Sequence, residues 1–454
     1  MWKHIRNLSL IVIVLAIGVI WYYTRPDKAQ LPLEKTEGVT PELSVPRPEK
    51  FPTIDVASVT GWAKGETPLV PEGYAIAAYA RGLDHPRSLY RMPNGDILVA
   101  ETNSPPRPDS GIRGWIMRTL MGRVGAGGTS ANRITLLRDA NKDGVPETRS
   151  VFLTGLNSPF GMALVGSTFY VANTDAVMAF PYQQGALKIT DKGRKIYELS
   201  ATAPNNHWTR NLEVSRDGKK LYIAVGSSTN IAENGLKNER YRAMVIEYDI
   251  AEDKGIPWSA GLRNPVGLDW NPATGELWTV VNERDMLGSD LVPDYLTRAE
   301  WGTDYGWPHH YFGGHTDGRV QPEKPEKRQY ERWPDYALGA HVAPLGLLFN
   351  DGKLDLGSKY ASGAFIARHG SWNRSPKSGY DVVFVAFDAN GKPVGKPMPF
   401  VTGFLNKDEA ARGRPVMLER DATGALLVSD DVGNVIWRIT RKSAAKSVKQ
   451  PSAD

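Results

Sequence analysis

The stretch GLRNPVGLDWNPATGELWTVVNE, residues 261–283, decides the fold of this chain. A polar opening phrase that ends in Pro and Gly is followed by a strand-like run, a turn and a second strand-like run. Variations of this unit begin at Gly82, Gly155, Asn206 and Arg412. Strand–turn–strand units at irregular intervals of about 50 to 80 residues are typical of a β-propeller. Because each blade presents the same phase of its unit at one end of the axis, we expect the opening phrases to converge in space.

The chain after Pro71 follows the same β pattern. Short runs rich in β-branched and aromatic residues are bounded by turn pairs such as Asn94–Gly95, the signature of strands joined by hairpins. Opening phrases near residues 82, 155, 206, 261, 343 and 412 predict six blades. The predicted fold class is therefore all-β, a six-bladed β-propeller. Residues 104–130 and 285–340 exceed ordinary hairpin loops, and we expect both to lie over the mouth of the axis.

Size, charge and cysteine content limit the possible functions. The chain has 454 residues, 41% of them hydrophobic, which is enough to bury a large core. Its formal net charge of +5 comes from dispersed basic residues, so we expect no nucleic-acid partner and a weak preference for anionic ligands. The absence of cysteine excludes thiolate metal sites, thiol nucleophiles and disulfides.

The N-terminus carries a predicted targeting segment. Two basic residues precede an apolar run over residues 8–23, which ends in three aromatic residues as a membrane-interface belt does. Since no small-residue cleavage site follows, we favour an uncleaved transmembrane signal anchor over residues 1–23; a cleaved signal peptide is the alternative. Either segment would export the body, and we expect it at the periplasmic face of the inner membrane.

The remaining boundaries follow from composition. Residues 24–70 are polar and rich in Pro, and they are expected to form a linker with little helix of its own. Residues 71–440 contain the propeller. Residues 441–454 form a polar tail.

Histidine and arginine side chains stand in the opening phrases. His207 opens a blade, and an unperturbed pKa of about 6.5 suits a histidine to accept a proton at neutral pH; the alternative is a structural histidine that binds a loop carbonyl. Arg263, Arg412 and Arg414 share the blade phase, and Arg368 ends a strand of the fifth blade. Each arginine alone is typical of a solvated surface. Gathered at one axis, the guanidinium groups would repel one another unless a polyanionic ligand lay among them.

A second candidate site is the segment DANKDGVPE, residues 139–147. Asp139, Asn141 and Asp143 place oxygen ligands at alternate positions, and the sixth position is Gly144, as in a calcium loop. The acidic residue expected at the twelfth position is replaced by Ser150. The segment is therefore either a calcium loop or an Asx-type hairpin turn.

These motifs resemble a known family, the PQQ-dependent glucose/sorbosone dehydrogenases, six-bladed propellers that hold pyrroloquinoline quinone (PQQ) and oxidise sugars. The resemblance covers roughly residues 71–440 and is most specific in GLRNPVGLDWNP, in YGWP at 305–308 and in RGRP at 412–415. The phrases HPRSLYRMPNGDILVAETNS, NERDMLGSDLVPDY and ARHGSWNR look most like the sorbosone-dehydrogenase-like branch. PQQ carries three carboxylates, so the resemblance implies a reason for arginines to gather.

The resemblance also implies roles for matching residues. His207 resembles the base that takes the proton of the sugar hydroxyl while a hydride passes to the quinone. Arg263 resembles the arginine that stabilises charge on the quinone oxygen. Cofactor contacts are implied for Asn157, Asn264, Arg368, Arg412 and Arg414.

The resemblance also concerns a calcium site and the residue that orients His207. Family members place a calcium ion on PQQ, held by backbone carbonyls of a loop that matches residues 282–285, so Glu283 and Arg284 are implied ligands. Where the soluble glucose enzymes have an aspartate beside the catalytic histidine, this chain offers Ser227. The orienting group of His207 therefore differs from the family pattern.

The sequence predicts a PQQ-dependent sugar dehydrogenase of the sorbosone or aldose type. Such an enzyme oxidises a sugar hydroxyl or a hydrated aldehyde and passes electrons to a membrane quinone or another acceptor. The enzymatic alternative is a propeller lactone hydrolase, which would place carboxylates on the axis where this chain has arginines. The non-enzymatic alternative is an exported propeller that binds a glycan or a protein without catalysis.

Overall fold

The computed structural model describes residues 27–49, 53–106 and 128–442, together with a few isolated positions. Strands dominate this part of the chain, and its helical segments are short 3₁₀ turns, namely η1 (Leu33–Thr36), η2 (Leu236–Glu239), η3 (Pro325–Tyr330) and η4 (Ser358–Tyr360). Apart from isolated positions, the predicted anchor over residues 1–23 lies outside the described residues, as does the tail beyond residue 442. None of the helices that the structure describes is long and apolar enough to cross a membrane.

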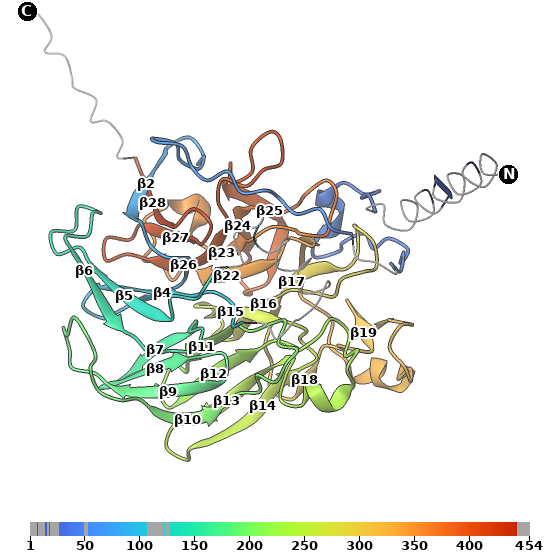
Figure 1. The fold of residues 1–454 in the computed structure, drawn as a ribbon, viewed down its shortest axis with the longest axis horizontal. Helices are drawn as coiled ribbons and strands as arrows, with labels where there is room; N and C mark the ends of the chain where they lie inside the picture. Colours follow the sequence, from blue (N-terminus) through green and yellow to red (C-terminus); the bar gives the residue numbers. More distant parts are fainter. Residues whose placement is uncertain are drawn as a thin grey trace, which may run out of the picture.

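Six antiparallel sheets form the blades, numbered here in chain order (Figure 1). Blade 1 contains β3 (Pro86–Arg91), β4 (Ile97–Glu101), β5 (Arg133–Arg138) and β6 (Thr148–Leu153); blade 2 contains β7 (Met162–Val165), β8 (Thr168–Ala172), β9 (Ala176–Pro181) and β10 (Arg194–Glu198); blade 3 contains β11 (Arg210–Val214), β12 (Lys220–Val225), β13 (Met244–Asp249) and β14 (Lys254–Ala260). Blade 4 contains β15 (Pro265–Trp270), β16 (Leu277–Val281), β17 (Pro293–Arg298) and β21 (Tyr336–Ala340); blade 5 contains β22 (Pro344–Phe349), β23 (Gly363–Arg368), β24 (Asp381–Phe387) and β25 (Pro393–Val401); blade 6 contains β26 (Pro415–Arg420), β27 (Leu426–Asp430), β28 (Val435–Arg441) and β2 (Tyr74–Arg81). The prediction of six blades is confirmed.

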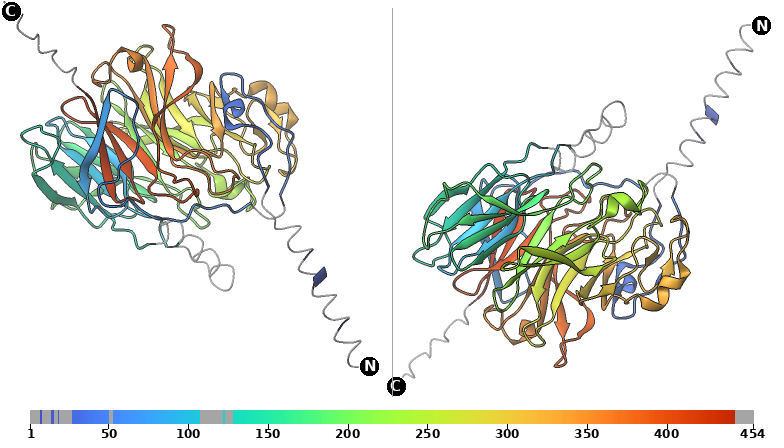
Figure 2. Two further views of the ribbon diagram at one scale, coloured as in Figure 1. Left: turned by 90° about the horizontal axis from the view of Figure 1, so that it is seen from above. Right: turned by 90° about the horizontal axis from the view of Figure 1, so that it is seen from below.

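The blades close into a ring. Their innermost strands contact one another in the order β3, β7, β11, β15, β22, β26 and back to β3. Blade 6 takes its outermost strand, β2, from the chain before blade 1, and β2 pairs antiparallel with β28. The blue β2 accordingly lies against the red strands of the last blade (Figure 2). A strand that precedes blade 1 and the last described strand of the chain are therefore held in one sheet.

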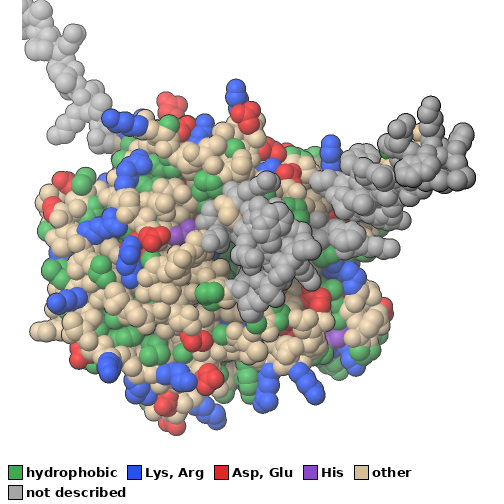
Figure 3. Space-filling model, in the orientation of Figure 1, with side chains coloured by type: hydrophobic (Ala, Val, Ile, Leu, Met, Phe, Trp, Pro, Cys, Tyr) green, Lys and Arg blue, Asp and Glu red, His purple; other side chains and the backbone are tan. Residues whose placement is uncertain are grey.

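Apolar side chains of neighbouring blades pack together in the interior of the propeller. One buried cluster contains a residue from each of five blades, namely Leu89, Phe160, Val266, Leu345 and Val416. The inner strands of these blades are therefore joined by apolar contacts. On the face shown in Figure 3, basic and acidic side chains are interspersed.

Glycine in the opening phrases is required by close packing between neighbouring inner strands. A Cβ on Gly267 of β15 would lie 2.8 Å from both the carbonyl oxygen of Leu345 and the backbone nitrogen of Leu347 in β22. Gly161 and Gly346 are crowded in the same way by the inner strand of the next blade. The recurring Pro-x-Gly of the repeat therefore sets the distance between blades.

Gly267→Ala is expected to lower the free energy of unfolding by about 1–3 kcal/mol, because the new methyl group meets backbone atoms that cannot rotate away. Gly318→Ala is the matched control, since a Cβ there meets nothing within 4 Å. Denaturant unfolding of both variants measures the difference. Equal stability of the two variants would show that the blades can move apart without cost.

Residues 285–340 are largely part of blade 4 and not the lid that their length predicts. β17 and β21 are its third and fourth strands, and both are buried on two faces, so neither shows the alternation that marks a strand in sequence. The segment 299–335 between them adds β18 (Thr303–Asp304) to blade 3 and forms the hairpin of β19 (His310–Tyr311) and β20 (His315–Thr316). Most of the second expected lid, residues 104–130, lies outside the described residues.

The predicted linker packs on the propeller wherever the structure describes it. β1 (Glu37–Gly38) pairs with β21 as a fifth strand of blade 4. Farther along, Val59 bridges to Ala411 and Leu69 bridges to Thr402. Residues 27–49 and 53–70 are therefore part of the folded domain, in contrast to the free tether that their composition suggests.

Candidate functional site

The opening phrases meet at one end of the axis, as their shared phase predicts. Arg87 of β3 lies with its guanidinium carbon 5.4 Å from the centroid of the Trp208 ring, just before β11. The same guanidinium donates a hydrogen bond of 2.6 Å to Asp431, which follows β27. His369, directly after β23, contacts this carboxylate at 3.0 Å. Blades 1, 3, 5 and 6 thus contribute side chains to one contiguous group.

We name His85, Arg87, His369, Arg414 and Asp431 the axial cluster. Its centre is Asp431, whose side chain is 1% exposed and lies within 3.4 Å of a nitrogen of His85, Arg87 and His369. Burial alone would raise the pKa of Asp431, but the adjacent His369, His85 and Arg87 hold that pKa well below its ordinary value of 3.8. The carboxylate is therefore ionised.

His369 is oriented by Asp431. Its Nε2 lies 3.1 and 3.0 Å from the two carboxylate oxygens, so Nε2 carries the proton and Nδ1 keeps a lone pair. Burial, reinforced by the charges of Arg414 and Arg87, lowers the pKa of His369 to about 4. The ring is neutral at pH 7, and the carboxylate stabilises the imidazolium that forms when Nδ1 accepts a proton.

Arg414 and Arg87 carry N–H groups that no described residue accepts. The guanidinium of Arg414, a residue 6% exposed, lies 5.0 Å from the Tyr380 ring centroid and donates to the Tyr380 hydroxyl at 2.8 Å. Its Nε and that of Arg87 are buried without an acceptor, and within the described part of the chain Arg414 forms no salt bridge. A buried guanidinium with free donors is suited to a carboxylate or phosphate ligand.

Arg263 has no such free donor. Its Nε donates to the Asn230 carbonyl, Nη1 donates to the carbonyls of Asn282 and Glu283, and Nη2 donates to Asn230 Oδ1 and Asp285 Oδ2. These bonds use all five N–H groups of the guanidinium. Arg263 therefore holds together Asn230, Asn282, Glu283 and Asp285, a group that we call the wall. This structural role differs from the contact with a quinone oxygen that the resemblance implies.

Asp285 anchors this wall through an ion pair of 2.8 Å with Arg263. Asn373 donates to the second carboxylate oxygen at 2.8 Å, and Nδ1 of His341 lies 3.7 Å from it. Although burial opposes both shifts, Arg263 and His341 depress the pKa of Asp285, and Asp285 raises the pKa of His341. The wall is therefore a buried, charged network.

Asp285→Asn is expected to lower the free energy of unfolding at pH 7 by about 3 kcal/mol, because it leaves two buried cations unpaired. The folded-state pKa of Asp285 is depressed, so its stabilisation is present above the ordinary value of 3.8 and is lost as the pH falls below it. The difference between parent and variant should shrink from pH 5 to pH 3 in denaturant titrations. A difference that stays constant over this range would contradict the assignment; Glu198→Gln, at an exposed ion pair, is the control.

His207 lies beside the wall. Its Nδ1 is 2.9 Å from both the carbonyl oxygen and Oγ of Ser227. Since Ser227 Oγ donates its proton to the Thr229 carbonyl, both Ser227 atoms accept from Nδ1, and Nε2 keeps the lone pair. Burial and the charge of Arg263 lower the pKa of His207 well below 6.5. Ser227 thus orients the ring, but it brings no negative charge to stabilise an imidazolium.

Asn264 presents an unpaired acceptor next to His207. A Cβ on Gly226 would lie 2.2 Å from Asn264 Oδ1 and 2.6 Å from the Cβ of His207, so the glycine lets these side chains pack together. Asn264 is 8% exposed, and its buried Oδ1 has no hydrogen-bond partner in the described part of the chain. Buried polar atoms are usually paired, so this oxygen is an acceptor beside His207 that the described residues leave unsatisfied.

Arg368 and Arg412 are neutralised elsewhere and do not join the axial cluster. Arg368 forms ion pairs of 2.6 Å with both Asp381 and Glu37. Arg412 forms an ion pair of 2.8 Å with Glu66. Glu37 and Glu66, which bind these two arginines, both belong to the segment before the first blade. The family resemblance implies cofactor contacts for Arg368 and Arg412 and does not predict these ion pairs.

Asn157 lies in the loop before β7 and is exposed. Its backbone nitrogen donates to Asn173 Oδ1, and its carbonyl accepts from the backbone of Thr174. The structure gives its side chain no hydrogen bond to another described residue, so a cofactor contact by Asn157 stays a prediction.

The two predicted calcium positions are occupied by protein donors. In the loop 282–285, the carbonyl of Glu283 accepts from Arg263 at 2.6 Å, and the Asp285 carbonyl accepts from Arg319 at 3.1 Å. The carbonyl oxygens therefore face guanidinium groups. The Arg284 side chain is fully buried and pairs with Glu283 and Asp317.

The loop at residues 139–147 is an Asx-type turn. Asp139 accepts from the backbone nitrogens of Asp143 and Gly144, and Asn141 accepts from that of Asp143. The side-chain oxygens thus bind backbone N–H groups. Over residues 27–49, 53–106 and 128–442, no group of three histidine or acidic side chains is arranged to hold a metal ion.

The aromatic segment 301–312 supports the wall. Trp307 is 6% exposed and donates through Nε1 to the Asn230 carbonyl at 2.9 Å. The carbonyls of Pro308 and His310 accept from Arg284. Tyr305, Trp307, Tyr311 and Phe312 are buried within the protein, whereas Trp301 is exposed.

The sequence does not predict His85, Arg87, His369 or Asp431 as site residues, although the first three lie within quoted phrases and Asp431 lies in the unit that begins at Arg412. His85 and Arg87 belong to HPRSLYR, His369 belongs to ARHGSWNR, and Asp431 ends the RGRP unit. Their position at the start or end of a blade unit was the available signal. Among the described residues, no carboxylate is hydrogen-bonded to the ring of His207, whereas the ring of His369 is hydrogen-bonded to Asp431.

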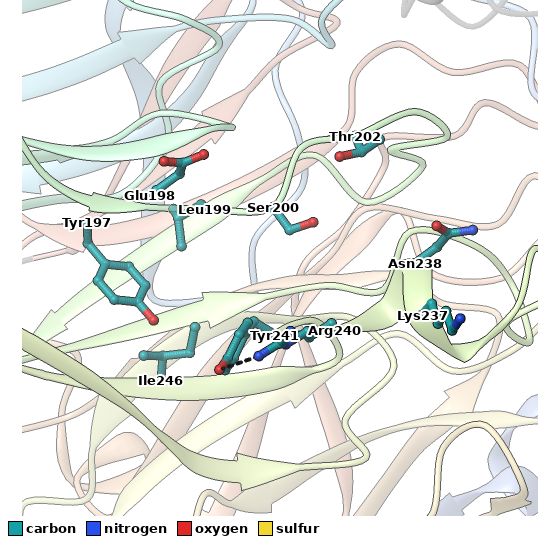
Figure 4. A pocket seen from close by; sticks show the side chains of 10 residues that line it. All are labelled: Tyr197, Glu198, Leu199, Ser200, Thr202, Lys237, Asn238, Arg240, Tyr241 and Ile246. Atoms are coloured by element: carbon teal, nitrogen blue, oxygen red, sulfur yellow. Dashed lines mark hydrogen bonds between the residues drawn. The ribbon is translucent and has the colours of Figure 1, made fainter.

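A separate cavity lies on the rim between blades 2 and 3 (Figure 4). It has a volume of about 370 Å³ and is lined by side chains of β10, the loop after it and the η2 region. Arg240 and Tyr241 line it on one side, and Tyr197 and Glu198 line it on the other. None of the axial cluster residues borders this cavity.

Comparison with known proteins gives one family model and several relatives. The model described as TrAA12-like matches residues 68–294 and 320–442. A pyrroloquinoline quinone-dependent sugar dehydrogenase of Hypocrea jecorina is 25% identical over 419 residues, which cover 80% of this chain and 87% of that protein. A pyrroloquinoline quinone-dependent pyranose dehydrogenase of Coprinopsis cinerea is 26% identical over 436 residues, which cover 82% of this chain. The match spans 54% of the Coprinopsis protein, about half its length.

A solved structure of a Trichoderma reesei protein of carbohydrate-active enzyme family AA12 superimposes with a TM-score of 0.67. The alignment covers 86% of this chain and all of the other, at 22% identity. This likeness shows that the propeller fold is shared.

Proposed function

The chain belongs to the TrAA12-like family; on that premise we propose that it is a PQQ-dependent sugar dehydrogenase. The observation that carries the proposal is Arg414, a buried guanidinium with free N–H donors and no salt bridge in the described part of the chain, beside Arg87 at the mouth of the axis. PQQ bears three carboxylates, which match fork-like guanidinium donors. The names of the Hypocrea and Coprinopsis relatives support the same cofactor and substrate class.

Three residues of this chain would hold PQQ. Arg414 and Arg87 would donate to its carboxylates, and the unpaired Oδ1 of Asn264 would accept from a ring N–H. When bound, PQQ supplies the acceptor for the two electrons and the hydrogen of the sugar carbon. Because the carbonyls of the loop 282–285 face Arg263 and Arg319, calcium at that loop forms no part of the proposal.

The proton of the sugar hydroxyl would pass to His369. Nδ1 of this ring keeps its lone pair, and Asp431 stabilises the imidazolium after proton uptake. His207 is the second candidate, because its Nε2 lone pair is also available beside the unpaired Asn264. Ser227, which orients His207, carries no negative charge, whereas the Asp431 carboxylate accepts a hydrogen bond from His369, so we assign the proton to His369.

The electron acceptor and the location of the protein rest on the sequence. The apolar run at residues 8–23 supports a signal anchor and a position at the periplasmic face of the inner membrane. A membrane quinone is the acceptor that such a position favours. Sorbosone and aldoses are the proposed substrates.

The test uses the full chain, purified in detergent without cofactor and titrated with PQQ. Saturable PQQ binding, followed by dye reduction with an aldose or with sorbosone, is the expected result. Binding without turnover on any sugar would favour the binding-module alternative. Absence of PQQ binding, or hydrolysis of a lactone by the cofactor-free chain, would overturn the proposal.

A further inference from the structure

Residues 53–70, here called the strap, cross the loop that presents Arg414. The backbone of Thr60 donates to the Ala411 carbonyl at 2.8 Å. Glu66 forms its ion pair with Arg412, two residues before Arg414. The strap therefore binds one end of the loop at residues 411–414. Arg414, at the other end of this loop, belongs to the axial cluster and has free guanidinium donors.

Trp62 of the strap binds the carboxylate that shapes this loop. Its Nε1 donates to Asp430 Oδ2 at 2.7 Å, and Trp437 donates to the same oxygen at 3.2 Å. The other oxygen, Oδ1, accepts from the backbone nitrogens of Arg414 at 2.8 Å and Gly433 at 2.7 Å. One fully buried carboxylate thus links the strap to the backbone of Arg414.

The fit around Asp430 leaves little room for the loop to shift. A Cβ on Gly413 would lie 2.0 Å from Asp430 Oδ2, and one on Gly433 would lie 2.3 Å from it. The Trp62 ring packs edge-on against Phe404 and Trp437, with centroids 5.6 and 5.2 Å away. The indole is therefore held in place independently of its hydrogen bond.

We propose that Trp62 is a positioning residue of the site formed by Arg414 and Arg87, here called the anion site. Through Asp430, Trp62 holds the Arg414 backbone so that the free guanidinium donors face the ligand. The ligand part of this inference rests on the proposed function. Asp431, the next residue, orients His369, so the same turn also sets the proton-accepting histidine. A segment that precedes the first blade thereby becomes part of the site.

Trp62→Phe tests the proposal, because it removes the N–H donor and keeps an aromatic ring. Trp270→Phe is the matched control, since Trp270 is also half-buried and its Nε1 donates at 2.7 Å to the Val214 carbonyl, away from the axis. Hydrogen exchange of the cofactor-free full chain should speed up at the amides of Arg414 and Gly433 in Trp62→Phe only. The dissociation constant for PQQ should rise about tenfold in Trp62→Phe and stay near the parental value in Trp270→Phe.

Unchanged exchange at Arg414 and Gly433 would overturn the positioning role, whatever PQQ does. Equal weakening of PQQ binding in both variants would overturn it as well, since the effect would then be general loss of stability. If the parent protein does not bind PQQ, the proposed function fails, and the exchange measurement alone decides whether Trp62 holds the loop.

Discussion

His369→Ala is expected to lower the turnover number of the PQQ-loaded protein by about 10²–10⁴-fold, the range that a positioned general base contributes. The variant loses the Nδ1 lone pair, while Arg414 keeps its donors, so the dissociation constant for PQQ should change by less than about threefold. Single-turnover dye reduction measures the first quantity, and fluorescence titration with PQQ measures the second. A lost rate with retained affinity would separate proton transfer from cofactor binding.

His207→Ala is the comparison that decides between the two histidines. It removes a neutral ring bound to Ser227, and the expected loss of turnover is smaller than that of His369→Ala. The pH dependence adds a second criterion: the pKa of His369 is lowered to about 4, so the proton acceptor stays available at acidic pH down to about that value. If His207→Ala abolished turnover and His369→Ala did not, the base would be His207.

Arg414→Gln is expected to weaken PQQ binding about 100-fold, because it removes the charge and the Nε donor that no described residue accepts. Arg412→Gln is the matched control. Arg412 lies two residues away, and its charge is already balanced by Glu66. Its replacement should change PQQ affinity by less than about threefold.

Both affinities can be measured by the same titration at fixed ionic strength, since salt screens the charge interaction. Comparable losses in the two variants would mean that the strap side of the loop, and not the axial side, faces the ligand. Unchanged affinity in Arg414→Gln would remove the main support for the proposed function.

The sequence predicts the blades well because the repeat has a physical cause. The crowding around Gly267 explains why Pro-x-Gly recurs, and a recurring constraint is visible without a structure. β17 and β21 were missed for the opposite reason: with both faces buried, their residues show no period-two alternation.

The site was predicted at the correct end of the axis but only partly in its members. The phase of the repeat places Arg263, Arg368 and Arg412 near that end, yet it cannot show which carboxylates lie beside them. Glu37 pairs with Arg368, and Glu66 pairs with Arg412, across most of the length of the chain. Only the three-dimensional structure shows which guanidinium groups are left with free donors.

The sheet that joins β2 to β28 has a consequence for biosynthesis. Arg414 and Asp431 belong to blade 6, which contains β2, a strand that precedes blade 1 in the chain, and the three strands that the ribosome makes last. A nascent chain that has emerged only as far as blade 5 has neither of these residues. The proposed anion site is therefore completed by the same event that seals the ring, so we expect only a chain synthesised through blade 6 to bind PQQ.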